Sequence, residues 1–188
     1  MSAEVQIVIG PYFEAPAACQ EYDERACLVA RQVGELITAK MPSLIVEHIG
    51  STAVPDCAGK GVVDLMVLYP AGHLAAARAT LDDLGFQRQS TRDPFPEERP
   101  MRTGSVVMGD KVFRLHAHVI AADAPEAAQL RLFRDRLRSD DELRQAYVAR
   151  KRAIIANGVT DSIDYCLAKG IFVENALAQQ AAGEEEKA

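Results

Sequence analysis

The segment VEHIGSTAVPDCAGKGVVDLMVLYP, residues 46–70, places a glycine-serine turn between two apolar runs, and the second run contains one aspartate, Asp64. Aspartate is a poor strand former, and burying it without a partner is costly. Side chains alternate between the two faces of a strand, so Asp64 shares a face with Val62, Met66 and Leu68. An acidic group on this apolar face either accepts backbone N–H groups at the strand edge or points at a metal or substrate near the turn.

The turn has the composition of a phosphate-binding loop. Gly50 allows a ligand to approach the backbone closely, and Ser51 and Thr52 add hydroxyl donors beside exposed N–H groups. The tripeptide Gly-Ser-Thr also occurs in many ordinary turns, so the motif alone is unspecific. Its combination with Asp64 in the following strand favours a binding site.

Hydrophobic periodicity along the rest of the chain predicts an α+β fold with a mixed sheet. Strands are expected at about residues 5–9, 44–49, 62–69, 86–89, 105–108 and 111–121, and helices at about 16–40, 73–84, 130–137, 140–156 and 161–180. A type I′ turn is expected at Gly109 and Asp110, and a capping box of Ser139 and Glu142 is expected to begin the fourth helix. The segment of residues 90–104 has three prolines and no periodicity, which predicts a long loop.

The chain has 188 residues, of which 48 % are apolar, and this suits a single domain with a substantial core. We expect that domain to cover residues 1–182. Its sheet-containing part should end at about residue 123, and its C-terminal helices should occupy about 124–182. Residues 183–188 are expected to form a disordered tail.

Composition excludes several functions and favours one compartment. A net charge of −6, the absence of Trp and an aromatic content of 6 % make nucleic acid an unfavourable partner. The chain shows no basic and apolar leader and no apolar run of about 20 residues, so we expect no membrane association. Four scattered cysteines without a CxxC pair fit reduced thiols in the cytoplasm. The sequence makes no prediction of an oligomeric state.

A second polar face occurs in the segment KVFRLHAHVIA, residues 111–121. Alternation places Arg114, His116 and His118 together, opposite the apolar residues of the same strand. These side chains are either half-exposed on an outer sheet face or part of a site. In a site, the two imidazoles could bind a transition metal with Asp64 or act as an acid/base pair on a ligand.

These motifs resemble the GrpB-like family of the DNA polymerase beta-like nucleotidyltransferase superfamily. The resemblance rests on HIGSTAVP with KGVVDLMV, and continues in VIGPYFEAP, RLHAHVI, FRDRLRSDDELRQAYVARK and DYCLAKGIFVENAL. It therefore extends along most of the chain. The sequence departs from the family pattern at Gly61, where proline is usual, and at Asp56-Cys57, where Gly-Leu is common.

The resemblance implies a nucleotidyltransferase-like fold and a specific site. Gly50 and Ser51 would hold a triphosphate, and carboxylates on two strands would hold two Mg²⁺ ions that activate an acceptor hydroxyl. The first carboxylate corresponds to Asp64, but the second position is Met66, whose thioether is a poor ligand for Mg²⁺. The same resemblance places His116 and His118 beside Asp64. A divalent metal at these three residues, Mg²⁺ or Mn²⁺ in preference to Zn²⁺, is the implied cofactor.

Other candidate ligand contacts lie beside the turn and in the C-terminal helices. Alternation allows only one of Glu47 and His48 to face the pocket, and the resemblance favours His48, with Glu47 on the surface. Lys60 is expected to contact a phosphate or Asp64, unless it is a surface lysine. The resemblance also selects Arg134, Tyr147 and Lys151 as one wall of a cleft, although solvated helix faces are the default explanation of such residues.

The sequence therefore predicts two functions. The first is a protein that binds a nucleotide or another phosphorylated small molecule, with metal-dependent nucleotidyl or related group transfer as its chemistry. The alternative is a non-catalytic ligand-binding or accessory domain with a degenerate active site, which Met66 favours. Whether the protein is an enzyme is left open at this point.

Overall fold

A computed structural model describes residues 7–185, with side chains up to residue 178. The elements, in chain order, are α1 (Arg25–Lys40), β1 (Ile45–Ile49), the 3₁₀ turn η1 (Ser51–Ala53), β2 (Val62–Tyr69), α2 (Leu74–Asp83), β3 (Gln87–Arg88), β4 (Met101–Met108), β5 (Lys111–Ala121), α3 (Pro125–Ser139), α4 (Asp141–Ala156) and α5 (Ser162–Glu185). The sheet order is β1-β2-β5-β4-β3, with β2 and β5 parallel and the other pairs antiparallel. The predicted α+β class with a mixed sheet is confirmed.

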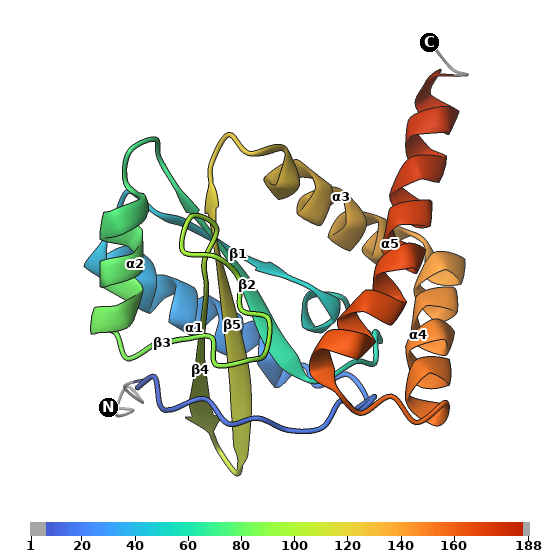
Figure 1. Cartoon of the computed structure of the whole chain (residues 1–188), viewed down its shortest axis with the longest axis horizontal. Helices are drawn as coiled ribbons and strands as arrows, with labels where there is room; N and C mark the ends of the chain where they lie inside the picture. The colour runs from blue at the N-terminus through green and yellow to red at the C-terminus, as the bar shows by residue number, and fades with distance from the viewer. Residues whose placement is uncertain (1–6, 186–188) are drawn as a thin grey trace, which may run out of the picture.

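One face of the sheet carries the main hydrophobic core. Leu65 of β2 and Leu115 of β5 are fully buried there, together with Val33 of α1 and Leu81 of α2. Figure 1 shows α1 and α2 packed on this side, while α3, α4 and α5 lie at the other end of the molecule. The sequence pattern placed Leu65 and Leu115 on the apolar face of their strands, and the structure confirms this for both strands.

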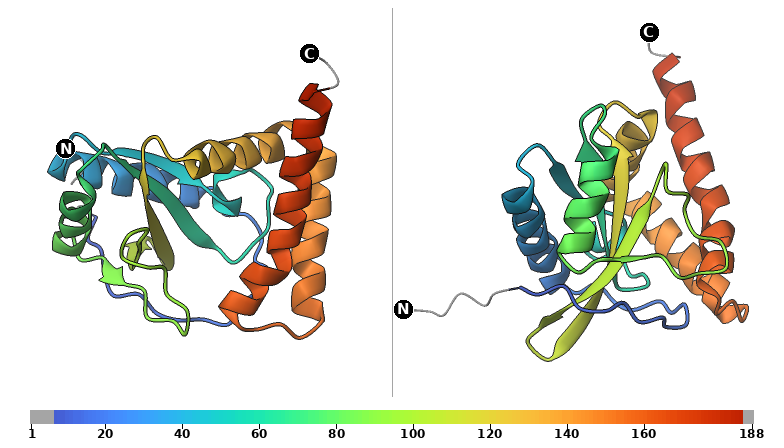
Figure 2. Two further views of the ribbon diagram at one scale, coloured as in Figure 1. Left: turned by 45° about the horizontal axis from the view of Figure 1, so that its top comes forward. Right: turned by 60° about the vertical axis from the view of Figure 1, so that its left-hand side comes forward.

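The C-terminal helices form a separate layer. Helix α3 contacts β1 and β5, and α4 and α5 pack side by side against each other and against α3 (Figure 2). A smaller apolar cluster joins α3 to the sheet through Ile49, Met66, Leu68, Ile120 and Ala127. The open face of the sheet, which carries Asp64, thus faces the helical layer.

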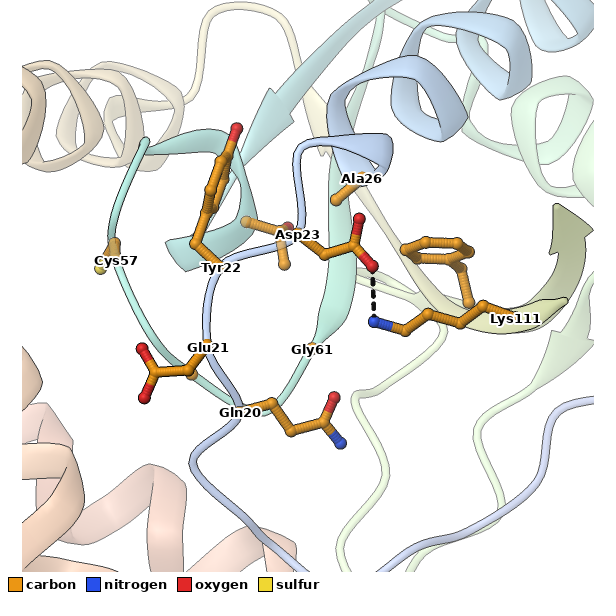
Figure 3. Close-up of a pocket in the computed structure, with 11 residues that line it drawn as sticks. Gln20, Glu21, Tyr22, Asp23, Ala26, Cys57, Gly61 and Lys111 are labelled. Atoms are coloured by element: carbon orange, nitrogen blue, oxygen red, sulfur yellow. Dashed lines mark hydrogen bonds and ion pairs between the residues drawn. The ribbon is translucent and has the colours of Figure 1, made fainter. Parts of the chain in front are cut away.

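The first helix is shorter than predicted because the residues before it bond to other parts of the chain. The N–H of Ala17 donates to Thr160, and Gln20 forms a two-way backbone bridge with Gly59. The helix begins at Arg25, whose N–H donates to Asp23 Oδ1 at 3.0 Å. Figure 3 shows this segment beside residues 57–61, with Asp23 also pairing with Lys111 at 2.8 Å. The cavity between them is only about 10 Å³, too small for a ligand.

Four local predictions need correction. No strand forms at residues 7–9, where Gly10 makes only an isolated bridge to Ser105, and residues 5–6 lie outside the described part. At the β4–β5 turn only Gly109 has a positive φ, which fits a type II′ turn and not type I′. Asp140, not Ser139, caps α4 by accepting the Leu143 N–H. Helix α5 extends to Glu185 and so overlaps the first three residues of the expected tail, 183–188, of which 186–188 lie outside the described part.

Candidate ligand-binding site

A cleft of about 490 Å³ separates the open face of the sheet from the helical layer. It is lined by nine of the residues selected from the sequence, namely Gly50, Ser51, Lys60, Asp64, His116, His118, Arg134, Tyr147 and Lys151. His48 and Thr52 do not line it. Residues from both halves of the chain therefore meet at one cavity large enough for a small ligand.

The Gly-Ser turn is built around Asp64. Gly50 has φ 72° and ψ −171°, a conformation that is essentially restricted to glycine. A Cβ at this position would lie 2.5 Å from Asp64 Oδ2. The backbone of Gly50 thus passes so close to the carboxylate that no side chain fits. The sequence predicted close approach of a ligand at this glycine, and the structure shows close approach of Asp64.

The acidic and histidine residues predicted from separate strands lie together. Strand pairing sets Asp64 opposite His116, and Asp64 Oδ1 is 3.3 Å from His116 Nδ1 and 3.7 Å from His118 Nε2. Burial disfavours the charged carboxylate, but the two imidazoles outweigh it and hold the pKa of Asp64 well below its usual value. Burial lowers the pKa of His116, although Asp64 opposes that shift. An ionised carboxylate therefore faces two imidazoles in the cleft.

Two further side chains orient these imidazoles. The Tyr12 hydroxyl is 3.1 Å from His116 Nε2, so the Nδ1 atom of this ring is the one that faces Asp64. Arg99 Nη1 is 3.4 Å from His118 Nδ1, which leaves Nε2 on the Asp64 side. Sequence reasoning missed both residues. Tyr12 lies in a segment without regular secondary structure or periodicity, and Arg99 lies at the end of the loop before β4.

His48 points away from the cleft and supports the turn instead. Antiparallel pairing places Glu47 opposite Met66, so Glu47 and not His48 shares the face of Asp64. The hydroxyl of Thr52 donates to the Val62 carbonyl at 3.0 Å, and it is 3.0 Å from His48 Nε2. Because the hydroxyl proton is already used, His48 Nε2 donates to Thr52. Burial lowers the pKa of His48 to about 4, which keeps the ring neutral near pH 7.

Glu47 is not the surface residue that the sequence suggested. It accepts hydrogen bonds from Arg131 Nε at 2.9 Å and from Arg134 Nη1 at 3.2 Å. These arginines, Arg131 first, lower the pKa of Glu47. Arg134 also pairs with Asp135 at 2.8 Å, so its charge is largely neutralised within the protein. It lines the cleft mainly as part of this ion-pair network.

The lysines of the cleft have a different environment. Lys151 is 1 % exposed, donates to the Ala58 carbonyl, lies 3.4 Å from Cys57 Sγ, and sits over the Tyr147 ring at 4.2 Å. Burial lowers the pKa of Lys151. Lys60 donates to Ser162 Oγ at 2.7 Å. Neither ammonium group has a carboxylate partner among the residues that the structure describes.

Helix α5 adds two groups that the sequence treated as a solvated face. Lys169 lines the cleft without a hydrogen-bond partner among residues 7–178, and the Tyr165 hydroxyl is buried there with none. Acidic neighbours, Tyr147 first and Cys166 and Asp64 among the others, outweigh burial and raise the pKa of Lys169. The spacing of these two residues was visible in the sequence, but nothing local indicated which way the helix faces.

The mixed sheet and the cleft beside Asp64 define an α+β protein with a cavity of ligand size, the fold class that the sequence predicted. The chain matches the family model described as GrpB protein over residues 16–179, and it belongs to the GrpB family. This membership confirms the family to which the motifs pointed.

Three known proteins illustrate the similarity. UPF0157 protein SCO7215 of Streptomyces coelicolor is 34 % identical over 167 residues, which cover 88 % of this chain and 84 % of that protein. The crystal structure of GrpB from Enterococcus faecalis has a TM-score of 0.62 at 20 % identity and covers 87 % of this chain and 99 % of its own. Cid1 in complex with its short product ApU has a TM-score of 0.47 at 12 % identity, over 71 % and 42 % of the two chains. None of the helices in the described part is long and apolar enough to cross a membrane.

Proposed function

We propose that the cleft binds a nucleotide or another phosphorylated small molecule. The observation that carries this proposal is the distribution of lysine charge. Lys40 and Lys111, outside the cleft, pair with Asp83 and Asp23. Lys60, Lys151 and Lys169, inside it, pair with no carboxylate among the described residues. Three lysines without an ion-pair partner that line one cavity, in a chain of net charge −6, favour an anionic ligand.

The hydrogen-bonding groups of the cleft suit phosphate oxygens. The buried Tyr165 hydroxyl lacks a protein partner, and leaving a buried polar group unpaired costs about 1–3 kcal/mol. A ligand oxygen that accepts from this hydroxyl would remove that cost. Ser51 and the backbone of the Gly50 turn line the same cleft and add further donors.

The remaining wall suits an apolar or aromatic part of the ligand. Phe133 and Tyr147 line the cleft and pack edge to face, with ring centroids 5.2 Å apart. A base or another flat group could pack against the half-buried Phe133, while its phosphates reach the lysines. This division of the cleft supports a nucleotide-like ligand over inorganic phosphate.

Group transfer is the second part of the proposal. Asp64 and its two imidazoles lie in the same cleft as the proposed phosphate contacts, and a divalent metal held there would supply Lewis-acid activation. Met66, at the second carboxylate position, is fully buried in the apolar cluster beneath α3. Ligand binding is thus better supported than two-metal nucleotidyl transfer.

The four free cysteines are consistent with the proposed cytoplasmic location.

Thermal unfolding with pairs of phosphorylated and unphosphorylated compounds tests the binding proposal. Nucleotides and sugar phosphates are compared with their parent nucleosides and sugars. We expect stabilisation by phosphorylated members only, and a ligand at 100 times its Kd should add about 2.7 kcal/mol. Lys169→Ala should abolish the effect, while Lys40→Ala, a matched lysine outside the cleft, should retain it. Equal stabilisation by the unphosphorylated partners, or an unaffected Lys169→Ala variant, would refute the proposal.

Turnover is tested separately, with the compounds that bind. Asp64→Asn should abolish any group transfer while leaving the fold intact by circular dichroism. Binding without turnover in the wild type would identify the non-catalytic alternative, which the buried Met66 favours.

A further inference from the structure

The donor atoms beside the Gly-Ser turn do not match the metal site that the superfamily implies. That site uses carboxylates from two strands to hold two Mg²⁺ ions, and Mg²⁺ prefers an octahedron of oxygen ligands. Here the cluster has one carboxylate, Asp64, and two imidazoles, His116 and His118. Met66 occupies the position of the second carboxylate but is fully buried among apolar side chains. Of the other acidic residues lining the cleft, Glu14 and Asp93 are exposed and lie outside the cluster.

We infer that Asp64, His116 and His118 bind a single transition-metal ion of the Zn²⁺, Co²⁺ or Mn²⁺ type, and not a pair of Mg²⁺ ions. Imidazole nitrogen favours such ions over Mg²⁺, and one carboxylate completes a mixed nitrogen and oxygen set. The proposed metal site lies in the same cleft as the proposed function, but metal binding there does not require a phosphorylated ligand. It can therefore succeed or fail on its own.

The geometry of the three donor atoms suits one ion. With metal–ligand bonds of about 2.1 Å, tetrahedral neighbours lie about 3.4 Å apart. Asp64 Oδ1 is 3.3 Å from His116 Nδ1 and 3.7 Å from His118 Nε2, and all three donor atoms lie within 4.8 Å of one another. Paired strands β2 and β5 hold them in place, because Asp64 is opposite His116 and Met66 is opposite His118. Rotation of the two imidazole side chains would bring this arrangement to a three-ligand site with open positions toward the cleft.

The hydrogen-bond partner of His116 is appropriate for a metal ligand. Metal-bound histidines usually donate their second ring N–H to an oxygen, which fixes the orientation of the ring. The Tyr12 hydroxyl, 3.1 Å from His116 Nε2, provides that oxygen. It directs Nδ1 toward Asp64, so Tyr12 is assigned as a positioning residue of the site.

The neighbour of His118 has the opposite effect. Arg99 Nη1 lies 3.4 Å from His118 Nδ1, and a guanidinium group can only donate. Binding through Nε2 would turn the Nδ1–H of His118 toward this cation. Arg99 therefore has to withdraw toward Glu126, to which its Nε already donates at 2.9 Å. We expect this competition to lower the affinity of the site for the metal, so that chelators can remove the ion.

Metal titration of the full chain, treated with a chelator and free of nucleotide, tests the inference. Calorimetry should give one Zn²⁺, Co²⁺ or Mn²⁺ per chain, each bound at least about 10-fold more tightly than Mg²⁺. Co²⁺ should develop visible absorption bands with nitrogen ligation. His116→Gln and His118→Gln should each lower the affinity at least about 10-fold, and Tyr12→Phe should lower it about 10-fold without removing a ligand. His73→Gln, which alters a histidine outside the cleft, should change neither affinity nor spectrum.

Several outcomes would overturn the inference. These are two ions per chain, equal affinity for Mg²⁺, or wild-type affinity in both histidine variants. If either histidine variant fails to fold, Asp64→Asn takes its place, and its unchanged metal affinity would be equally contradictory. A normal metal site with no binding of phosphorylated compounds would leave this inference standing and refute the proposed function alone.

Discussion

Replacing Gly50 by alanine should both destabilise the fold and displace Asp64. The backbone at φ 72° and ψ −171° is essentially restricted to glycine, and forcing another residue into it costs about 1–3 kcal/mol. The new Cβ would lie 2.5 Å from Asp64 Oδ2 and 3.2 Å from its Cβ. Asp64 cannot rotate freely, because Ile49 is opposite it on β1 and His116 on β5. We therefore expect a total loss of about 3–4 kcal/mol in the free energy of unfolding.

The matched control is Gly72→Ala. Gly72 has φ 79°, but its added Cβ would meet nothing within 4 Å, so only the backbone cost of about 1–2 kcal/mol remains. Urea unfolding of both variants, followed by circular dichroism, gives the two free energies. Metal titration then reports whether Asp64 has moved. A Gly50→Ala variant as stable as Gly72→Ala, with wild-type metal affinity, would refute the close packing of the turn on the carboxylate.

Three further predictions concern single side chains. His48 has a pKa of about 4 in the folded chain and about 6.5 in the unfolded chain, so the unfolded chain binds the proton more readily. The free energy of unfolding should therefore be highest above pH 6.5 and fall toward pH 4 by at most about 3 kcal/mol. Urea unfolding of His48→Gln should show a flatter pH dependence than that of the wild type. Tyr165→Phe should leave the ligand-free protein as stable as the wild type or about 1 kcal/mol more stable, yet weaken binding of phosphorylated compounds in calorimetry; a clear loss of stability would show that its hydroxyl has a protein partner. Asp140→Ala should cost about 1 kcal/mol by removing the cap on the Leu143 N–H, whereas Ser139→Ala should cost less than about 0.5 kcal/mol, and equal thermal shifts would contradict this cap assignment.

The features that follow from local periodicity were predictable from the sequence. The two-residue period of strands correctly placed Asp64 on one face of β2, and His116 and His118 on one face of β5. The same rule could not decide between Glu47 and His48, because the outcome depends on which residue of β1 pairs with which residue of β2. That register is a property of the hairpin and not of either strand alone.

Other features depend on contacts between distant segments, which no local pattern records. The sequence pattern predicted a helix that includes residues 16–24, but backbone groups of this segment form hydrogen bonds with Gly59 and Thr160 instead. Lys60, Lys151 and Lys169 come from a loop and two helices, and only the packing of α4 and α5 brings them to one cleft. The sequence could suggest each lysine singly, but not that all three would lack carboxylate partners.

The most direct test of the central claim is a crystal structure of the full chain with the phosphorylated compound that gives the largest thermal shift. We predict phosphate density in the cleft, within hydrogen-bonding distance of Lys169 Nζ or Tyr165 Oη. Phosphate bound elsewhere on the molecule, with only solvent between the sheet and α5, would contradict the account. The account would also be contradicted if no phosphorylated compound in the panel stabilised the protein.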